Sequence, residues 1–230
     1  NSTREIDPEA TDLFTLANRE QPKGEDMKTR TNWIRKIVMV GLLGLLPLSA
    51  EAETARWAID PDHSVIEFRV AHMVVSKTSG RFLDYQGFVE MDAAAKTFTM
   101  IEATIKAESI NTNQDKRDAH LRNTDFLDVN QFPTITYKMK NYQKQGDSYT
   151  VVGDLTLRGL TKAVTLNVTF NGVAKDPWGN TRAGFSADGK LNRKDFGMVW
   201  NKTLDTGGLV VGDEVQIHLD IECIKAQKTS

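Results

Sequence analysis

Apolar and polar residues alternate with a period of two along most of the chain after Trp57. In the stretch 65–72, the side chains of Ile66, Phe68, Val70 and His72 fall on one face. This alternation is typical of β-strands with one buried side and one solvent-facing side. The pattern recurs at 82–91, 101–105, 135–139, 155–157, 164–170, 185–191 and 215–221, which predicts about eight strands.

Turn-forming residues separate these strand segments, as at Asn171-Gly172, Gly207-Gly208 and in the segment 176–180. The segment 82–91 contains Gly87, and we expect the strand to bend there. The charged segment 113–129 interrupts the alternation. Its pattern predicts one or two short helical turns, which we interpret as a lid or plug within a single domain.

The strand pattern predicts an all-β fold but leaves its architecture open. Short antiparallel strands protect their edges either by packing as two sheets or by closing into a barrel. An eight-stranded barrel is either filled by side chains or holds a small ligand. Small residues on the inward faces, namely Ala103, Ala107, Ala187 and Gly189, leave space that favours a cavity.

The segment 27–52 has the order of a secretory signal peptide. Basic residues from Lys28 to Lys36 precede an apolar run at 37–48, which is followed by Ala50-Glu51-Ala52. The run is shorter than the ~20 residues that cross a bilayer. We therefore expect cleavage after Ala52, export to the periplasm, and a mature domain at 53–230. Residues 1–26 precede the expected start at Met27, and we interpret them as a non-native or over-extended segment.

Charge and cysteine content exclude several classes of function. The 29 basic and 31 acidic residues are interspersed, so no basic surface for nucleic acid is predicted. The single cysteine, Cys223, offers neither an internal disulfide nor a thiolate metal cluster. Its place in an apolar strand pattern indicates a small buried side chain.

The sequence contains no motif that predicts catalysis. The four histidines lack the spacing of a helical zinc motif, and no nucleophile elbow is present. Ser64 follows His63 directly, so their side chains should face opposite sides of a strand. The carboxylates near Asp118 and Asp125 belong to a charged segment, where solvated or arginine-paired groups are typical. We therefore predict no catalytic residues, no metal site and no cofactor.

Several spaced segments together carry a family resemblance. They are the stretches 63–73 and 78–82, the insertion 115–127, the strand start 132–135, the hairpin 153–162 and the strand end 191–197. In this order they resemble the YceI-like family of polyisoprenoid-binding proteins. The resemblance extends in order from Trp57 to Lys225. It implies an extended, eight-stranded, lipocalin-like antiparallel barrel with a short helical insertion. It also implies that an apolar pore takes a polyprenyl chain, such as that of an isoprenoid quinone or a prenyl phosphate.

With this resemblance, the inward faces give a set of candidate ligand-binding residues. His72 and Arg193 stand at strand ends, where they would contact a polar head group. The alternatives are a hydrogen-bonded histidine at the barrel rim and a structural pair of Arg193 with Asp195. The full set is Ile66, Phe68, Val70, His72, Phe82, Ile105, Ile135, Tyr137, Leu155, Leu166, Val168, Phe170, Phe185, Arg193 and Ile217.

Two other classes of function remain open. A carbohydrate-binding or adhesive β-module would use exposed aromatic residues, and Trp178 and Trp200 are the candidates. A small exported enzyme acting on a lipid is the other alternative. The expected partner is an isoprenoid lipid, together with a membrane protein that donates or accepts it, and a homodimer stays open.

Overall fold

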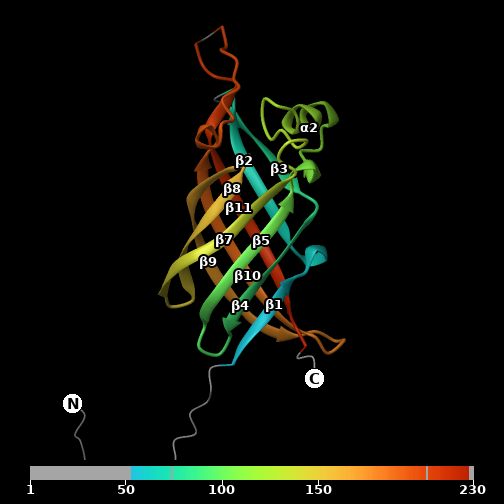
Figure 1. The fold of residues 1–230 in the computed structure, drawn as a ribbon, viewed down its shortest axis with the longest axis vertical. Coiled ribbons are helices and arrows are strands. Elements are labelled where there is room, and N and C mark those ends of the chain that lie inside the picture. Colours follow the sequence, from blue (N-terminus) through green and yellow to red (C-terminus); the bar gives the residue numbers. More distant parts are fainter. Residues whose placement is uncertain (1–52, 74, 206, 228–230) are drawn as a thin grey trace, which may run out of the picture. The chain divides into compact units, whose positions relative to one another are not determined.

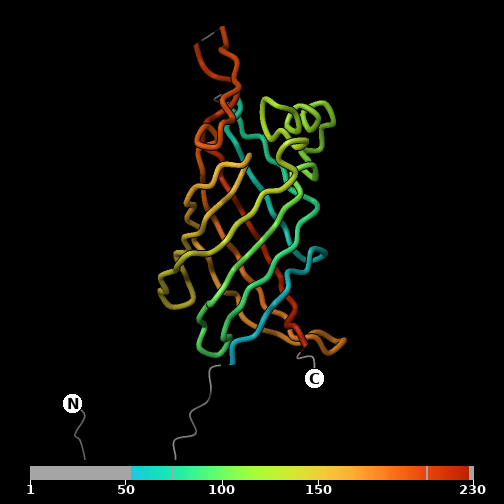
Figure 2. Tube along the Cα trace, viewed as in Figure 1, coloured from blue at the N-terminus to red at the C-terminus, as the bar shows by residue number. Residues whose placement is uncertain are grey.

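The computed structural model describes residues 53–73, 75–205 and 207–227. These residues form an antiparallel β-barrel with one short α-helix at its rim (Figures 1 and 2). The segments 1–26 and 27–52 lie outside the described residues, so the signal peptide and its cleavage stay predictions. Among the described residues, no helix is long and apolar enough to cross a membrane.

Most strands follow one another along the chain with short connections. The strands are β1 (Thr54–Ile59), β2 (Val65–His72), β3 (Ser76–Phe82), β4 (Tyr85–Asp92), β5 (Thr97–Lys106), β6 (Ile110–Asn111), β7 (Thr134–Gln145), β8 (Ser148–Leu157), β9 (Leu160–Lys175), β10 (Thr181–Asn192) and β11 (Val211–Lys225). The longer connections lie between β6 and β7 and between β10 and β11. The helical elements are η1 (Pro61–His63), η2 (Ala107–Ser109), α2 (Asp115–Arg122) and η3 (Arg193–Phe196).

The wall of the barrel has eight strand positions, because some of the short strands continue one another. β1 and β2 both pair with β11, at its two ends. β4 pairs with β1, and β3 pairs with β2, so β3 and β4 share the next position. β6 pairs with β3 where β5 has ended. Pairing of β1 with β11 closes the wall, which confirms the predicted eight-stranded antiparallel barrel.

The predicted bend at Gly87 is wrong. β4 continues through this residue, and the break falls at Leu83 and Asp84, between β3 and β4. A Cβ atom at Gly87 would lie 2.4 Å from the carbonyl oxygen of Glu102. The glycine therefore permits close approach of two paired backbones instead of a change of direction.

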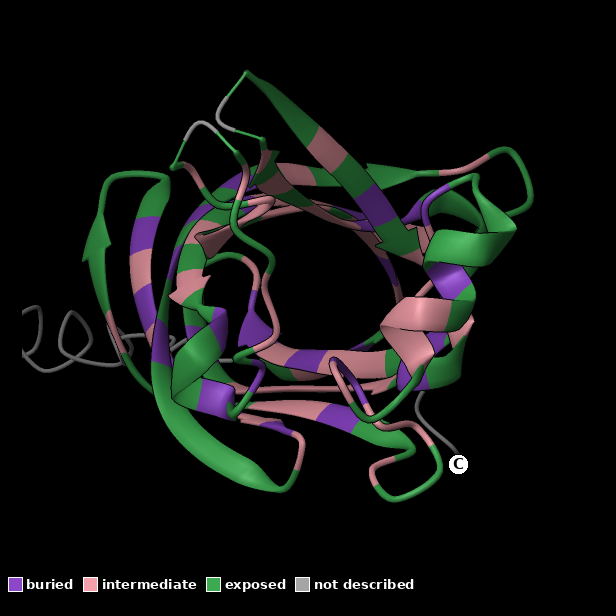
Figure 3. Ribbon diagram, turned by 90° about the horizontal axis from the view of Figure 1, so that it is seen from above, coloured by how far each residue is buried: buried purple, intermediate pink, exposed green. Residues whose placement is uncertain are grey.

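The period-two pattern does define the inner face of the wall. In β8, every second residue from Tyr149 to Leu157 is buried. In β9, Val164, Leu166, Val168 and Phe170 are buried between exposed neighbours. Figure 3 shows these alternating bands around the barrel, seen along its length. The buried side chains form one continuous apolar cluster inside the wall.

The two ends of the barrel differ in structure. At one end, called the lid end, lie α2, the turn between β2 and β3, the turn at Arg158 and Gly159, and the loop 197–210 (Figure 1). At the other end, called the far end, lie the turns 93–96, 146–147 and 176–180. We call the segment 107–133 the lid. It connects β5 to β7, and near its start β6 pairs with β3 of the wall.

Hydrogen bonds of charged side chains hold α2 against the preceding residues 108–112, which include β6 of the wall. Asp118 is 3% exposed and accepts hydrogen bonds from the backbone amide of Thr112 (2.9 Å) and from its hydroxyl. Arg117 donates to the hydroxyl (2.7 Å) and the carbonyl (2.8 Å) of Thr112. Arg122 donates to the carbonyls of Glu108 and Ile110, both at 2.7 Å. The charged insertion is thus ordered by contacts with backbone groups.

We expect the substitution Asp118→Ala to lower the free energy of unfolding by about 1–3 kcal/mol, because it leaves the buried amide and hydroxyl of Thr112 without their acceptor. Denaturant midpoints measure the change. Asp115→Ala is the matched control, since this carboxylate lies on the same helix and is exposed. Equal midpoints for the two variants would contradict the role assigned to Asp118.

Candidate functional site

The barrel encloses an apolar cavity of about 280 Å³. Its lining comes from strands all around the wall and from the lid, and the surface is apolar apart from a few side chains. A cavity near ~300 Å³ is at the lower end of the range of small-molecule sites. Its lining residues include Ile66, Phe68, Val70, Phe82, Ala103, Ile105, Ile135, Leu155, Leu166, Val168, Phe185, Ala187, Val215, Ile217 and Leu219.

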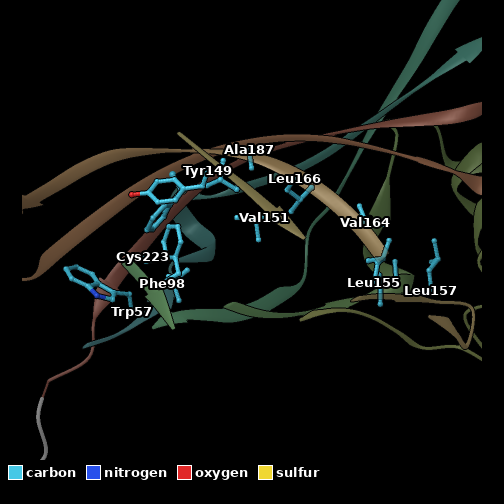
Figure 4. Packing of buried hydrophobic residues seen from close by; sticks show 14 of the residues in the cluster. Trp57, Phe98, Tyr149, Val151, Leu155, Leu157, Val164, Leu166, Ala187 and Cys223 are labelled. Atoms are coloured by element: carbon cyan, nitrogen blue, oxygen red, sulfur yellow. The ribbon is translucent and has the colours of Figure 1, made fainter. Parts of the chain in front are cut away.

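Aromatic side chains close the far end. Phe98 packs against Tyr149, with ring centroids 4.7 Å apart, and against Tyr142 at 5.4 Å. Phe185 contacts both Phe98 (6.0 Å) and Phe170 (5.4 Å). The backbone amide of Phe98 also donates to the hydroxyl of Tyr142 (3.2 Å). Figure 4 shows Phe98 and Tyr149 at one end of the buried cluster and Leu155 and Leu157 at the other.

The thiol of Cys223 is buried at the same end. Its residue has no exposed surface, and it stands near Trp57 in Figure 4. Burial raises the pKa of the Cys223 thiol to about 12. The side chain therefore behaves as the small buried group that the sequence predicted, without a reactive thiolate at neutral pH.

The lid and the following loop cover the other end of the cavity. Leu121, Phe126 and Leu127 reach it from the lid, and Met198 reaches it from the loop after η3. The ring of His120 packs edge-on against Phe126 (5.0 Å) and Trp200 (4.8 Å). These contacts join the lid to the loop 197–210 directly above the cavity.

Arg158 and Asp125 strengthen this junction. Arg158 donates to the carbonyl of Phe126 (2.7 Å) in the lid and to that of Gly197 (3.3 Å) in the loop. A nitrogen of the His120 ring lies 2.9 Å from a carboxylate oxygen of Asp125. The cover of the cavity is thus held by a few polar contacts around an aromatic cluster.

Tyr137 places a polar atom on the apolar lining. Its hydroxyl donates a weak hydrogen bond to the carbonyl of Val164 (3.5 Å). Burial raises the pKa of Tyr137 to about 12, with the nearby Asp154 acting in the same direction. The hydroxyl therefore stays neutral at physiological pH. Gly153 makes room for this ring, because a Cβ atom there would lie 2.3 Å from it.

Arg193 is another polar residue of the lining, which also includes Glu67, and most of its hydrogen bonds go to backbone carbonyls. The residue is 2% exposed. It donates to the carbonyls of Gly212 (2.8 Å), Trp200 (2.9 Å) and Met198. Its carboxylate partner is Asp213 (3.1 Å), so the predicted pairing with Asp195 is wrong. The reason is that η3 turns Asp195 outward, where it is exposed.

The structure brings the predicted ligand-binding residues together, with two exceptions. All of them except His72 and Phe170 line the cavity. His72 ends β2 and pairs with the lining residue Val211, next to a register shift between Val211 and Val215 in β11, but it does not itself line the cavity. Phe170 is buried in the aromatic cluster of the far end instead. Whether the lining residues contact a ligand stays a prediction.

Sequence reasoning did not select several lining residues. Leu121, Phe126, Leu127 and Met198 lie in the lid and the loop, where no strand periodicity marks an inward face. The short apolar group Phe126-Leu127 within a charged segment was the available signal. Other lining residues lie on the alternating faces that the sequence marked, although they were not among the predicted ligand-binding residues: Ile101, Leu157, Val164, Leu191, Leu219 and Ile221. Ile59, Val89, Phe98 and Val151 also line the cavity.

The small inward residues have different surroundings. Ala103 and Ala187 line the cavity, as the space argument predicted. Ala107 is 1% exposed and packs in the core without lining the cavity. At Gly189, a Cβ atom would lie 2.6 Å from the side chain of Leu166, so this neighbour fills the space.

A cluster of charged groups on the far end has a structural explanation. Asp60, His63 and Glu222 lie close enough to hold a metal ion. Arg182 already bridges these carboxylates, at 2.6 Å from Asp60 and in contact with Glu222, and it also pairs with Asp176 at 2.8 Å. The hydrogen bond from Arg182 lowers the pKa of Asp176. The guanidinium therefore neutralises the carboxylates and ties η1 to β10 and β11.

The residues considered for other chemistry are also engaged in structural contacts. Ser64 donates to the carbonyl of Glu222 (3.2 Å) and accepts from its amide (2.9 Å), which links β2 to β11. Trp200 packs in the aromatic cluster at the lid end. Trp178 is exposed in the turn 176–180 at the far end. The two tryptophans therefore do not form one sugar-binding platform.

Fold and site together define a closed antiparallel barrel with an apolar cavity under a lid. The chain belongs to the YceI-like family, because the YceI-like domain matches residues 57–223. The UPF0312 protein of Yersinia enterocolitica is 38% identical over 193 residues, which cover 82% of this chain and 97% of the relative. Protein YceI of Salmonella newport is 37% identical over 186 residues, with 80% and 94% covered.

Solved structures share the same fold. The YCEI protein of Campylobacter jejuni superposes with a TM-score of 0.60 at 31% identity, covering 68% of this chain and 90% of that chain. A polyisoprenoid binding domain from Saccharophagus degradans, implicated in plant cell wall breakdown, gives a TM-score of 0.57 at 13% identity. This match covers 76% of this chain and 100% of that domain and shows likeness of fold.

Proposed function

We propose that this protein binds the chain of a polyisoprenoid lipid, such as an isoprenoid quinone or a prenyl phosphate, in the barrel cavity. The observation that carries this proposal is the apolar cavity itself, whose lining is drawn from strands all around the wall. A barrel of eight strands has room either for packed side chains or for a ligand. Here several inward residues of β2 and β11, including Phe68, Ile217 and Leu219, remain partly exposed toward the interior.

Burial of the lipid chain supplies the binding free energy. Each fully buried methylene contributes ~0.8 kcal/mol, against losses from ordering the ligand. A few isoprene units therefore suffice for roughly micromolar binding. The Saccharophagus degradans domain, described as polyisoprenoid binding, supports the same ligand class for a barrel of this fold.

The polar groups at the cavity suit a carrier better than a catalyst. Tyr137 presents a neutral hydroxyl, and Arg193 directs its donors to backbone carbonyls. His63 and Ser64 take part in structural hydrogen bonds away from the cavity. We therefore propose binding without chemical conversion, so that the protein holds a membrane-derived lipid in water after export through the segment 27–52.

Mass spectrometry of the protein purified from a quinone-rich bacterial host tests this function. We expect an organic extract to contain a prenyl lipid in roughly stoichiometric amount, and the intact mass to correspond to a chain that begins at Glu53. Delipidated protein should then rebind prenyl compounds, with affinity that rises with chain length. An extract without lipid, together with no binding of any prenyl compound, would refute the proposal.

A further inference from the structure

Exposed apolar side chains gather on two loops at the lid end of the barrel. Val75, in the turn between β2 and β3, is 85% exposed, and Val199, in the loop 197–210, is 67% exposed. Met73 and Leu209, on the same two loops, are also exposed. We call these four residues the apolar tip. Large apolar side chains with this exposure are costly in water and mark contact surfaces when they occur together.

A backbone hydrogen bond joins the two loops, and further backbone contacts order the loop 197–210. The amide of Met73 donates to the carbonyl of Val210 (2.9 Å), and the amide of Val210 donates to the carbonyl of Lys202 (3.0 Å). Thr203 and Leu209 form an isolated β-bridge within the loop. Figures 1 and 3 both show the loops side by side at this end. The apolar tip is thus carried by two adjacent loops that are far apart in the sequence.

The apolar tip lies close in the chain to residues that line the cavity. Val70 and Val211 both line the cavity, and they stand shortly before Met73 and shortly after Leu209. His72, the last residue of β2, pairs with Val211. The two loops that carry the apolar tip therefore follow directly from strands of the cavity wall.

We propose that the apolar tip inserts into the surface of a phospholipid bilayer and places the lid end of the barrel against it. The inference rests on the proposed function, since a lipid carrier must collect or deliver its ligand at a membrane. The two loops contribute fewer residues than the roughly 20–30 that each partner contributes to a stable protein interface. A few apolar side chains are enough for shallow insertion among lipid head groups.

Exposed lysines near the apolar tip are compatible with a membrane surface as the partner. Lys77, at the start of β3, and Lys202, on the loop 197–210, are exposed, and Asp205 is an exposed acidic residue on the same loop as Lys202. Lysines near an anionic membrane surface add attraction that falls with ionic strength. Docking at this surface brings the aromatic junction of His120, Phe126 and Trp200 near the bilayer, so a prenyl chain can pass between membrane and cavity without crossing open water.

Flotation with phospholipid vesicles tests the proposal. The mature protein, freed of lipid, is mixed with vesicles of phosphatidylcholine, with and without phosphatidylglycerol and free of isoprenoids. The test variant is Val75→Asp combined with Val199→Asp. The matched control is Val173→Asp combined with Trp178→Asp, which removes two exposed apolar side chains and adds two acidic ones at the far end.

We expect the test variant to lose about tenfold or more in vesicle affinity, because two valines no longer insert. The control variant should bind like the unmodified protein. Binding of a short prenyl alcohol in solution should be equal in all three proteins, and transfer of a prenyl lipid from vesicles should slow in the test variant alone. Failure of the unmodified protein to bind vesicles, or equal losses in both variants, would overturn the inference, and the first result would indicate a protein partner. Loss of prenyl binding with vesicle binding retained would instead refute the proposed function.

Discussion

Phenylalanine at position 103 is expected to weaken the binding of a long prenyl chain by about tenfold or more, because the added ring takes the place of at least two buried methylene groups. Ala103 lies in the middle of β5, pairs with Gly87 and Tyr137, and lines the cavity. If the cavity is ligand space, the ring enters it and the ligand-free barrel stays folded. Shorter prenyl chains should be affected less than longer ones.

If the interior is a packed core instead of ligand space, a loss of stability of defined size is expected. In a packed core, the same substitution would destabilise the protein by ~1–3 kcal/mol through overpacking. Thr104→Phe is the matched control, since it adds the same ring to the adjacent residue, which is not part of the cavity lining. Denaturant midpoints of delipidated proteins and affinities for prenyl compounds of graded length separate the two cases. A loss of stability without a change in chain-length preference would contradict a ligand space at Ala103.

Much of the wall could be predicted because each strand has one buried face. Leu166 and Val168 line the cavity as their alternation indicated, and the same rule gave Phe68 and Ile217. Periodicity reports the side of a wall on which a residue lies. It does not report how far along the barrel axis the residue lies. For this reason Phe170, although it is on the correct face, belongs to the aromatic cluster that closes the far end.

His72 shows the same limit at the other end. The pattern continues through the last residue of β2, but His72 does not line the cavity although its paired residue Val211 does, and the register of β11 shifts between Val211 and Val215. Such a shift depends on how two distant strands pair, which no local pattern contains. The predicted role of His72 in head-group selection therefore concerns a residue outside the described cavity.

The lid and the loop after η3 could not be derived from periodicity. Leu121 and Phe126 reach the cavity because hydrogen bonds to backbone groups, such as those from Arg122 to Glu108 and Ile110, hold α2 against β6 and the residues before it. The partner of Arg193 was also not predictable from neighbouring residues. Asp213 reaches it from the start of β11, across a loop whose path only the tertiary structure defines.

Arg193 holds that loop in place, and Arg193→Leu is expected to lower the free energy of unfolding by about 3 kcal/mol or more, since each carbonyl left without a donor costs ~1–3 kcal/mol. The affected carbonyls belong to Met198, Trp200 and Gly212. Burial lowers the pKa of Arg193 from its ordinary value, while Asp213 acts in the opposite direction. The guanidinium therefore stays charged, and its planar set of donors matches several acceptors at once.

Two further substitutions make this prediction specific. Lys194→Met removes the other cation beside Asp213, which lies 2.8 Å away, but this lysine is exposed, so the expected loss is only ~0–1 kcal/mol. Arg193→Lys keeps the charge and loses most of the donors, so its stability should fall nearly as far as that of Arg193→Leu. Denaturant midpoints give the losses, and hydrogen exchange should rise across 197–213 in both Arg193 variants. If Arg193→Lys were as stable as the unmodified protein, charge alone would explain the role of this residue, and the carbonyl contacts that join the loop to the barrel would contribute little.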